Sequence, residues 1–110
     1  MEMDEILLRL KDKLTKEILW MYILKLLKER PMYAYEIRGQ LKRRFGFEPA
    51  TVSSYVVLYK LEEAGYVTSE WHEGESGRPS RKYYQLTEKG EKLLENGVKT
   101  IENVLEMLKE

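Results

Sequence analysis

The chain has no cysteine and only one histidine, His72. Without cysteine there is no disulfide, no thiol nucleophile and no thiolate ligand for zinc. One histidine among scattered carboxylates does not have the spacing of a metal site. The sequence also contains no glycine-rich phosphate loop after a strand and no nucleophile elbow. We therefore predict that the protein is not an enzyme and that it uses no metal or cofactor.

Long apolar runs are missing as well. The longest, residues 18–24, is far shorter than the roughly 20 residues that a membrane-spanning helix requires. We expect no membrane partner and a cytoplasmic location, with which the absence of cysteine is compatible. With 110 residues, 43% of them hydrophobic and 35% charged, the chain is long enough for one folded domain and too short for two.

The chain has no net charge, because 19 basic residues balance 19 acidic ones. The two signs are nevertheless separated along the sequence. Residues 31–61 contain five basic and two acidic side chains, and residues 77–92 contain the same numbers, whereas residues 62–76 and the C-terminal segment are acidic. Such segregation can build a basic surface on a neutral protein. Chance fluctuation is the other explanation.

Residues 48–65 are the most informative stretch and predict a helix. Pro49 and Thr51 suit its first turn, and Gly65 suits the position just past its end. An apolar stripe predicts its core side: Val52, Val56 or Val57, Leu58 and Leu61. The remaining face is polar and has no acidic residue before Glu62: Thr51, Ser53, Ser54, Tyr55 and Tyr59. A helix that must approach a polyanion and touch base edges needs such a face.

A shorter helix is predicted before it, over residues 35–44. Its inward side would hold Tyr35, Ile37 and Leu41, and its outward side would be basic: Arg38, Lys42, Arg43 and Arg44. A turn centred on Gly46 joins the two helices, because glycine accepts a positive φ. Two short helices with a tight turn are typical of a helix-turn-helix, although helical bundles contain such pairs too.

A β-hairpin is predicted after the helix pair. Residues 66–72 and 80–86 are rich in strand formers, and a glycine-containing loop of about seven residues separates them. The second limb is basic, with Arg78, Arg81 and Lys82. Helix-turn-helix followed by a hairpin is the layout of a winged helix, whose loop can approach phosphates. A solvated hairpin with protective charges is the alternative.

Both ends of the chain predict helices with heptad-like apolar stripes. In residues 1–14 the stripe consists of Met3, Leu7, Leu10 and Leu14. After a cap at Thr87, residues 88–110 carry Leu94, Val98, Ile101, Leu105 and Leu108. Residues 15–87 would form the winged helix-turn-helix of a single domain covering residues 1–110, with a core helix over 15–28 that ends before Pro31. The small domain leaves nothing to cover the terminal stripes, so we expect a homodimer. Packing of the two ends on each other within one monomer is the alternative.

Three segments give the chain a family resemblance: PMYAYEI at residues 31–37, SYVVLYKLEEAGYV at residues 54–67 and GRPSRKYYQLTEKG at residues 77–90. Together they resemble the PadR family of winged-helix transcriptional regulators. The resemblance implies a mainly α fold with a small β-hairpin (α+β), and a dimeric DNA-binding repressor of the small type with one C-terminal dimerisation helix. It places the helix around Tyr55 in the major groove and the wing on the DNA backbone. Members of this branch can bind flat aromatic compounds between subunits.

The sequence departs from the family pattern at three places. Family members usually have Gly at the position of Ala34, Pro at that of Val56, and Gly-Thr-Leu at residues 52–54. The last two departures lie on the expected DNA face, so they bear on the operator sequence.

The combined prediction is a homodimer that binds an inverted-repeat operator in double-stranded DNA and is released by an aromatic small-molecule effector. The predicted DNA-contacting residues are Tyr33, Lys42, Arg43, Arg44, Thr51, Ser53, Ser54, Tyr55, Lys60, Arg78, Arg81 and Lys82. The predicted dimer contacts are Leu7, Leu10, Leu14, Leu94, Val98, Ile101, Leu105 and Leu108. Tyr35 is expected inside, and Trp20 either packs in the core or lines an effector cavity. The alternative function is a winged helix that binds other proteins and not DNA.

Overall fold

Helix α2 (Leu19–Glu29) forms the centre of the fold because apolar residues cover most of its surface. The computed structural model describes residues 2–110, with side chains from residue 4 onward. The predicted stripe residue Met3 is therefore outside the described side chains, and residue 1 of the predicted N-terminal helix lies outside the described residues. Ile23, Leu24 and Leu26 of α2 are fully buried and contact the helices and strands packed around them.

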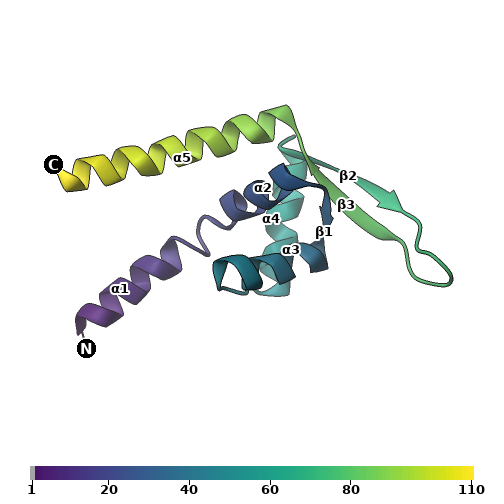
Figure 1. The fold of residues 1–110 in the computed structure, drawn as a ribbon, viewed down its shortest axis with the longest axis horizontal. Helices are drawn as coiled ribbons and strands as arrows, with labels where there is room; N and C mark the ends of the chain where they lie inside the picture. The colour runs from purple at the N-terminus through teal and green to yellow at the C-terminus, as the bar shows by residue number, and fades with distance from the viewer. Residues whose placement is uncertain (1) are drawn as a thin grey trace.

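The predicted helices and the two hairpin strands follow in the predicted order, with β1 (Met32–Tyr33) and one π-helical turn η1 (Leu41–Phe45) as additional elements (Figure 1). Besides α2, the predicted elements are α1 (Glu2–Lys13), α3 (Ala34–Gln40), α4 (Thr51–Glu63), β2 (Val67–His72), β3 (Arg81–Leu86) and α5 (Glu88–Lys109). The fold is mainly helical with a small antiparallel sheet, which confirms a winged helix-turn-helix with added terminal helices. No helix in the described part of the chain is long and apolar enough to cross a membrane.

The turn between η1 and α4 is held on α2 by aromatic packing. Gly46 adopts a φ of +76°, the positive value that was predicted for a glycine at the centre of this turn. Tyr22 of α2 lies edge-on against both Phe45 and Phe47, with ring centroids 5.0 Å apart in each pair. These contacts fix the angle at which the chain enters α4.

The sheet has three strands in the order β1-β3-β2, and the sequence predicted only two of them. Strand β1 is two residues long, too short for an alternating pattern to reveal it. It pairs Met32 with Tyr84 and Tyr33 with Tyr83, so the start of α3 lies against the base of the wing. The hairpin pairs Val67 with Leu86 at its base and continues in register to the far end.

The start of α5 is joined to the end of α4 through Thr87. Its hydroxyl oxygen accepts a hydrogen bond from the Gly90 N–H at 3.0 Å, which confirms the predicted cap. The same hydroxyl donates to the Gly65 carbonyl at 2.7 Å. The Lys89 ammonium donates to the Ala64 carbonyl at 2.6 Å, and Gly65 itself has a φ of +83°. The C-terminal helix therefore leaves the domain in a fixed direction.

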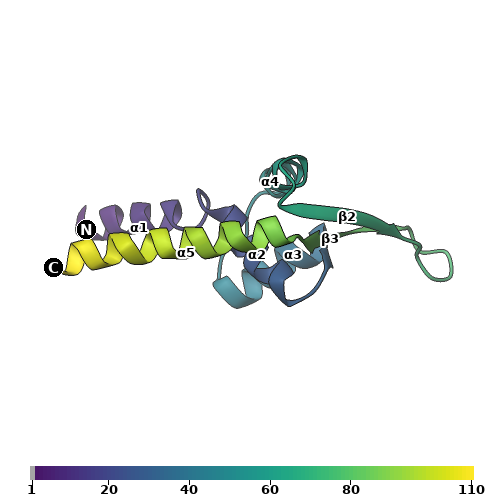
Figure 2. The ribbon, with the colours of Figure 1, turned by 90° about the horizontal axis from the view of Figure 1, so that it is seen from above.

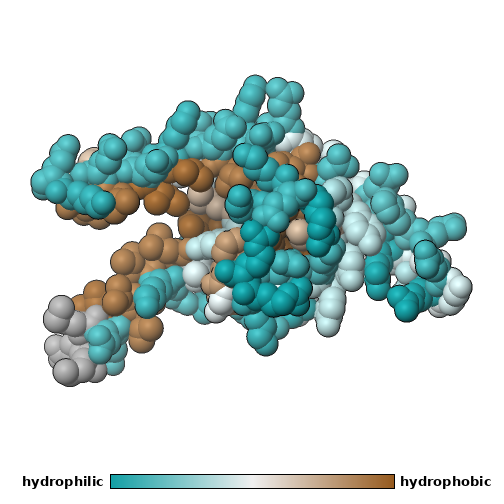
Figure 3. All heavy atoms as spheres, viewed as in Figure 1, coloured by the Kyte–Doolittle hydropathy of each residue, from teal (hydrophilic) through white to brown (hydrophobic). Residues whose placement is uncertain are grey.

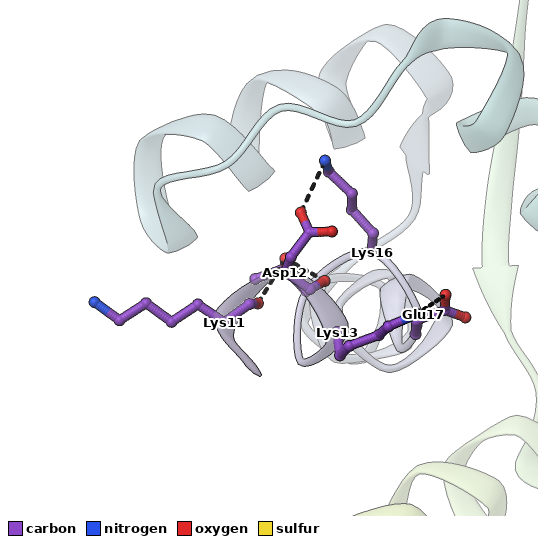
Figure 4. Close-up of polar contacts among 6 residues, drawn as sticks. Lys11, Asp12, Lys13, Lys16 and Glu17 are labelled. Atoms are coloured by element: carbon purple, nitrogen blue, oxygen red, sulfur yellow. Dashed lines mark hydrogen bonds and ion pairs between the residues drawn. The ribbon is translucent and has the colours of Figure 1, made fainter. Parts of the chain in front are cut away.

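A short turn over residues 14–18 separates α1 from α2, so the core helix begins later than residue 15 (Figure 4). The Thr15 hydroxyl donates to the carbonyls of Lys11 and Asp12, each at 3.0 Å, and closes the end of α1. Lys16 forms an ion pair with Asp12 at 2.8 Å. The Tyr22 hydroxyl donates to the Leu14 carbonyl at 2.7 Å and ties the turn to α2.

Two predicted inward positions are wrong. Tyr35 is 74% exposed, because α3 begins at Ala34 and turns Ala34 and Ile37 into the core instead. Val52 is 73% exposed, whereas Leu58 and Leu61 are buried as predicted and Val57 is half-buried. Leu94 is also corrected as a dimer contact, because it is already buried in the monomer core next to α2.

Candidate nucleic-acid interface

The exposed face of α4 is the first part of the candidate interface. Thr51, Ser53 and Tyr55 point outward from its first turns, with Lys60 at its last turn. Figure 2 shows α4 end-on, standing out from the domain beside β2. The helix carries no acidic residue in its first turn, so this face does not repel phosphate.

Ser54 is a correction to the predicted contact set, because it is fully buried. It shares the inner face of α4 with Leu58 and Leu61, four and seven residues further on. Its hydroxyl donates to the Ala50 carbonyl at 3.2 Å, which satisfies the buried polar group within the helix itself. A residue in this position cannot reach a base.

The wing contributes the second part. Arg78 and Arg81 are exposed on the loop and on the first residue of β3. The Arg81 guanidinium lies over the ring of Tyr33, 4.5 Å from its centroid, and Tyr33 lies edge-on to Tyr83 at 5.4 Å. This stacking restricts the Arg81 side chain, so less conformational entropy is lost when it binds an anion. Tyr33 and Arg81, which the sequence predicted separately, lie together.

Lys82 lies in a different environment. It is half-buried, and its ammonium is 3.4 Å from the carboxylate of Glu62 on α4. The other oxygen of that carboxylate accepts a hydrogen bond from the Ser69 hydroxyl on β2. The Lys82 ammonium also lies 5.5 Å from the ring centroid of Tyr84, a residue whose pKa is raised by burial. This cluster connects the recognition helix to both strands of the wing.

The basic side chains before the turn are largely paired with carboxylates. Lys42 lies 3.5 Å from Glu48, and Arg38 lies 3.8 Å from the same carboxylate. Arg44 donates to Glu29 at 2.7 Å. This hydrogen bond lowers the pKa of Glu29, and the same bond raises the pKa of Arg44. These pairs reduce the positive potential that α3 and η1 offer to DNA. Arg43 is the third predicted DNA-contacting cation of η1, and its guanidinium packs near Gly39.

A comparison of the sequence with protein-family models agrees with the winged-helix arrangement described above. A family model described as "Transcriptional regulator PadR-like family" matches residues 23–96. The chain belongs to the PadR-like family. A comparison with curated protein sequences gives no match.

Solved structures of PadR proteins resemble 74% or more of the chain. A PadR family transcriptional regulator from Eggerthella lenta is 28% identical over 99% of this chain and 94% of its own, with a TM-score of 0.84. A PadR-like transcription factor from Bacteroides fragilis is 31% identical over 92% of this chain and 96% of its own, with a TM-score of 0.76. PadR of Bacillus subtilis, solved with operator DNA, is 25% identical over 74% of this chain and 47% of its own, with a TM-score of 0.68.

Membership in the PadR-like family confirms that the protein is a transcriptional regulator with a DNA-binding winged helix-turn-helix and that it is not an enzyme. The described residues contain no group of three or more histidine, aspartate or glutamate side chains that could hold a metal. His72 lies against the ring of Tyr83, 4.6 Å between centroids, and takes part in wing packing.

The candidate interface also contains residues that the sequence did not identify as DNA contacts. A crevice of about 420 Å³ separates α4 from the wing, and its walls include Tyr35, Tyr55 and Trp71 as well as Arg81. Tyr35 and Trp71 are exposed there. Trp71 could have been identified from its position: Val67, Ser69 and Trp71 alternate on one face of β2, and the buried Val67 marks that face as the one turned toward α4.

Proposed function

We propose that the chain is a homodimeric repressor that binds an inverted-repeat operator, with α4 in the major groove and the wing on the DNA backbone. The observation that carries this proposal is the outward polar face of α4 beside the stacked Arg81 of the wing. Operator binding by the Bacillus subtilis PadR structure supports it. If both recognition helices reach one face of the duplex, the half-sites lie about one turn, or a multiple of it, apart.

The experiment is selection of bound duplexes from random DNA, followed by gel-shift titration of the enriched sequence at several salt concentrations. We expect an inverted repeat that binds far more tightly than unrelated DNA. If no sequence is enriched and the protein instead captures another protein through the same surface, the alternative of a winged helix for protein assembly is correct.

The terminal helices supply the proposed dimer interface. The exposed stripe residues are Leu7 and Leu10 of α1, Leu14 in the turn after it, and Val98, Ile101, Leu105 and Leu108 of α5. The two helices diverge (Figure 1), and apolar atoms follow the sides of both that face the space between them (Figure 3). In this arrangement the two ends do not cover each other, which argues against the intramonomer alternative. A second copy would bury both stripes in one helical bundle.

An effector site is proposed in the hollow between α2 and α5, which has a volume of about 550 Å³. Its walls combine apolar side chains such as Tyr22, Phe45 and Val98 with charged side chains of both signs: Lys25, Lys28, Lys99, Glu95 and Glu102. Trp20 lies instead against Gly97 of α5 and packs on the core. A planar aromatic compound fits the aromatic and apolar part of these walls. Titration with planar aromatic compounds, followed by tryptophan fluorescence and release of the selected operator, tests the site, and an unresponsive protein would contradict it.

A further inference from the structure

The exposed face of α4 carries two valines that no intramolecular packing explains. Val52 is 73% exposed and Val56 is 44% exposed. They are four residues apart and therefore lie one turn apart on the same side of the helix. A β-branched side chain on a helix is held in nearly a single rotamer, so the methyl groups of both valines are fixed in position.

The surroundings of the two valines favour an anionic partner. Tyr55 is exposed between them, and Arg81 and Lys82 of the wing line the same crevice as Tyr55. The nearest carboxylate before the helix, Glu48, is paired with Lys42 and Arg38. A protein partner with a large apolar face would have to cover these cations and phenols as well.

Duplex DNA is an anionic partner that presents an apolar group at the depth a recognition helix reaches. That group is the C5-methyl of thymine, which lies on the major-groove edge of the base. Residues near the start of the second helix of a helix-turn-helix are the ones that meet base edges. Val52 is the second residue of α4, and Val56 follows one turn later.

We propose that Val52 and Val56 contact thymine methyl groups, so that each operator half-site contains thymines at the positions that face them. The inference rests on the proposed DNA binding and specifies which bases are read. It also gives the two valines a role in selecting the sequence, while Tyr55 and the wing hold the backbone.

The test uses a duplex recovered by selection with the wild-type protein. Each thymine of one half-site is replaced in turn by deoxyuridine, which keeps every hydrogen-bonding group and removes only the methyl. We expect an affinity loss of about fourfold for each contacted methyl, the size that burial of one methyl group predicts. One or two thymines per half-site should show the loss.

Variants assign the loss to a side chain. In Val52→Ala and Val56→Ala, the corresponding uracil substitution should no longer weaken binding, because the contact is already absent. Both variants should fold, since alanine favours a helix more than valine does. Val56→Thr replaces one methyl by a hydroxyl of similar size and provides a second variant in which the uracil penalty at the Val56 position can be measured. Asn103→Ala on α5, an exposed position on the side of the helix opposite to the proposed dimer contacts, should keep the full uracil penalty.

Four outcomes would overturn the inference. Uracil substitutions without effect at every position would exclude methyl contacts while leaving the proposed function intact. A uracil penalty that persists unchanged in both alanine variants would assign the methyls to other residues. A change in assembly state of Val52→Ala without DNA would place the valines in a protein interface. Failure to recover any duplex would overturn the proposed function and, with it, this inference.

Discussion

Two residues of α4 have exchanged the roles that their side-chain polarity predicts. Ser54 is buried and Val52 is exposed. The local hydrogen bond from Ser54 to Ala50 removes the cost of burying the hydroxyl, and a single exposed valine costs little. Side-chain polarity alone therefore mispredicts which of these residues face the core, because apolar and polar side chains are not cleanly separated between the two sides of this helix.

Substitution of Ser54 should consequently affect folding more than DNA recognition. Ser54→Ala loses one internal hydrogen bond, and we expect a change in unfolding free energy of no more than about 1 kcal/mol with an unchanged selected sequence. Ser53→Ala, one position away and exposed, is the matched variant and should weaken operator binding. Urea denaturation and gel-shift titration measure the two effects. An altered sequence preference in Ser54→Ala would contradict the burial argument.

Arg81 is the residue whose loss should change the salt dependence of binding. Arg81→Ala removes a cation from each wing, so the slope of log affinity against log salt should fall by about one unit per lost phosphate contact, or about two for a dimer. Lys92→Ala removes the same charge from an exposed site on α5 and should leave the slope nearly unchanged. Equal slopes for all three proteins would show that Arg81 does not contact phosphate.

At the scale of elements, the wing and the recognition helix form one unit through Glu62. This carboxylate binds Ser69 of β2 and Lys82 of β3, and it projects from the last turns of α4. The separation between α4 and the wing is fixed by side chains that themselves need not touch DNA. We therefore propose that residues 62, 69 and 82 are positioning residues for the two parts proposed to contact DNA.

Breaking this cluster should weaken operator binding without the signature of a lost phosphate contact. Glu62→Gln frees the wing strands from α4, and we expect lower operator affinity with an unchanged salt slope. Glu63→Gln removes the same charge from the exposed neighbouring position and serves as the control. If both variants bind more tightly to a similar extent, charge alone explains the result and the cluster does not position the wing.

The sequence predicted the ends of helices correctly where a residue at the boundary itself causes the helix to begin or end. Gly46 and Gly65 end helices through positive φ, and Thr87 starts α5 through its side-chain oxygen. It missed β1, because a two-residue strand exists only through its pairing with β3. It also placed the start of the core helix at residue 15, whereas α2 begins at Leu19, after a turn that the bond from Tyr22 to the Leu14 carbonyl ties to α2.

The whole molecule is elongated, with a radius of gyration of 16.0 Å and a longest extent of 56 Å. A compact chain of this length would have a radius of gyration of about 13 Å. The excess comes from α1 and α5, which reach away from the domain on the side opposite to the wing (Figure 1). The proposed dimer contacts therefore lie at the end of the molecule opposite to the wing, and α4 lies between the two ends (Figure 2).

Disruption of the α5 stripe should abolish dimerisation and, with it, tight operator binding. Ile101→Glu places a charge in the proposed helical bundle, and we expect a monomer by sedimentation. Operator affinity should fall at least tenfold, because the two half-sites no longer bind as one unit. Asn103→Glu introduces the same charge on the opposite side of the helix and should remain dimeric. A monomeric wild-type protein, or a dimeric Ile101→Glu, would contradict the proposed interface.

The sequence by itself determined the winged-helix order, the helix caps and the basic wing, because each depends on residues that are neighbours along the chain. Only the tertiary structure decided which side of α4 faces outward, that Arg81 stacks on Tyr33, and that Lys82 binds Glu62. These features join residues distant in sequence, and their distances are set by how α2 packs the helices and strands around it. The sequence predicted that Val56 and residues 52–54 bear on the operator, but only this packing showed that Val52 and Val56 are both exposed on α4.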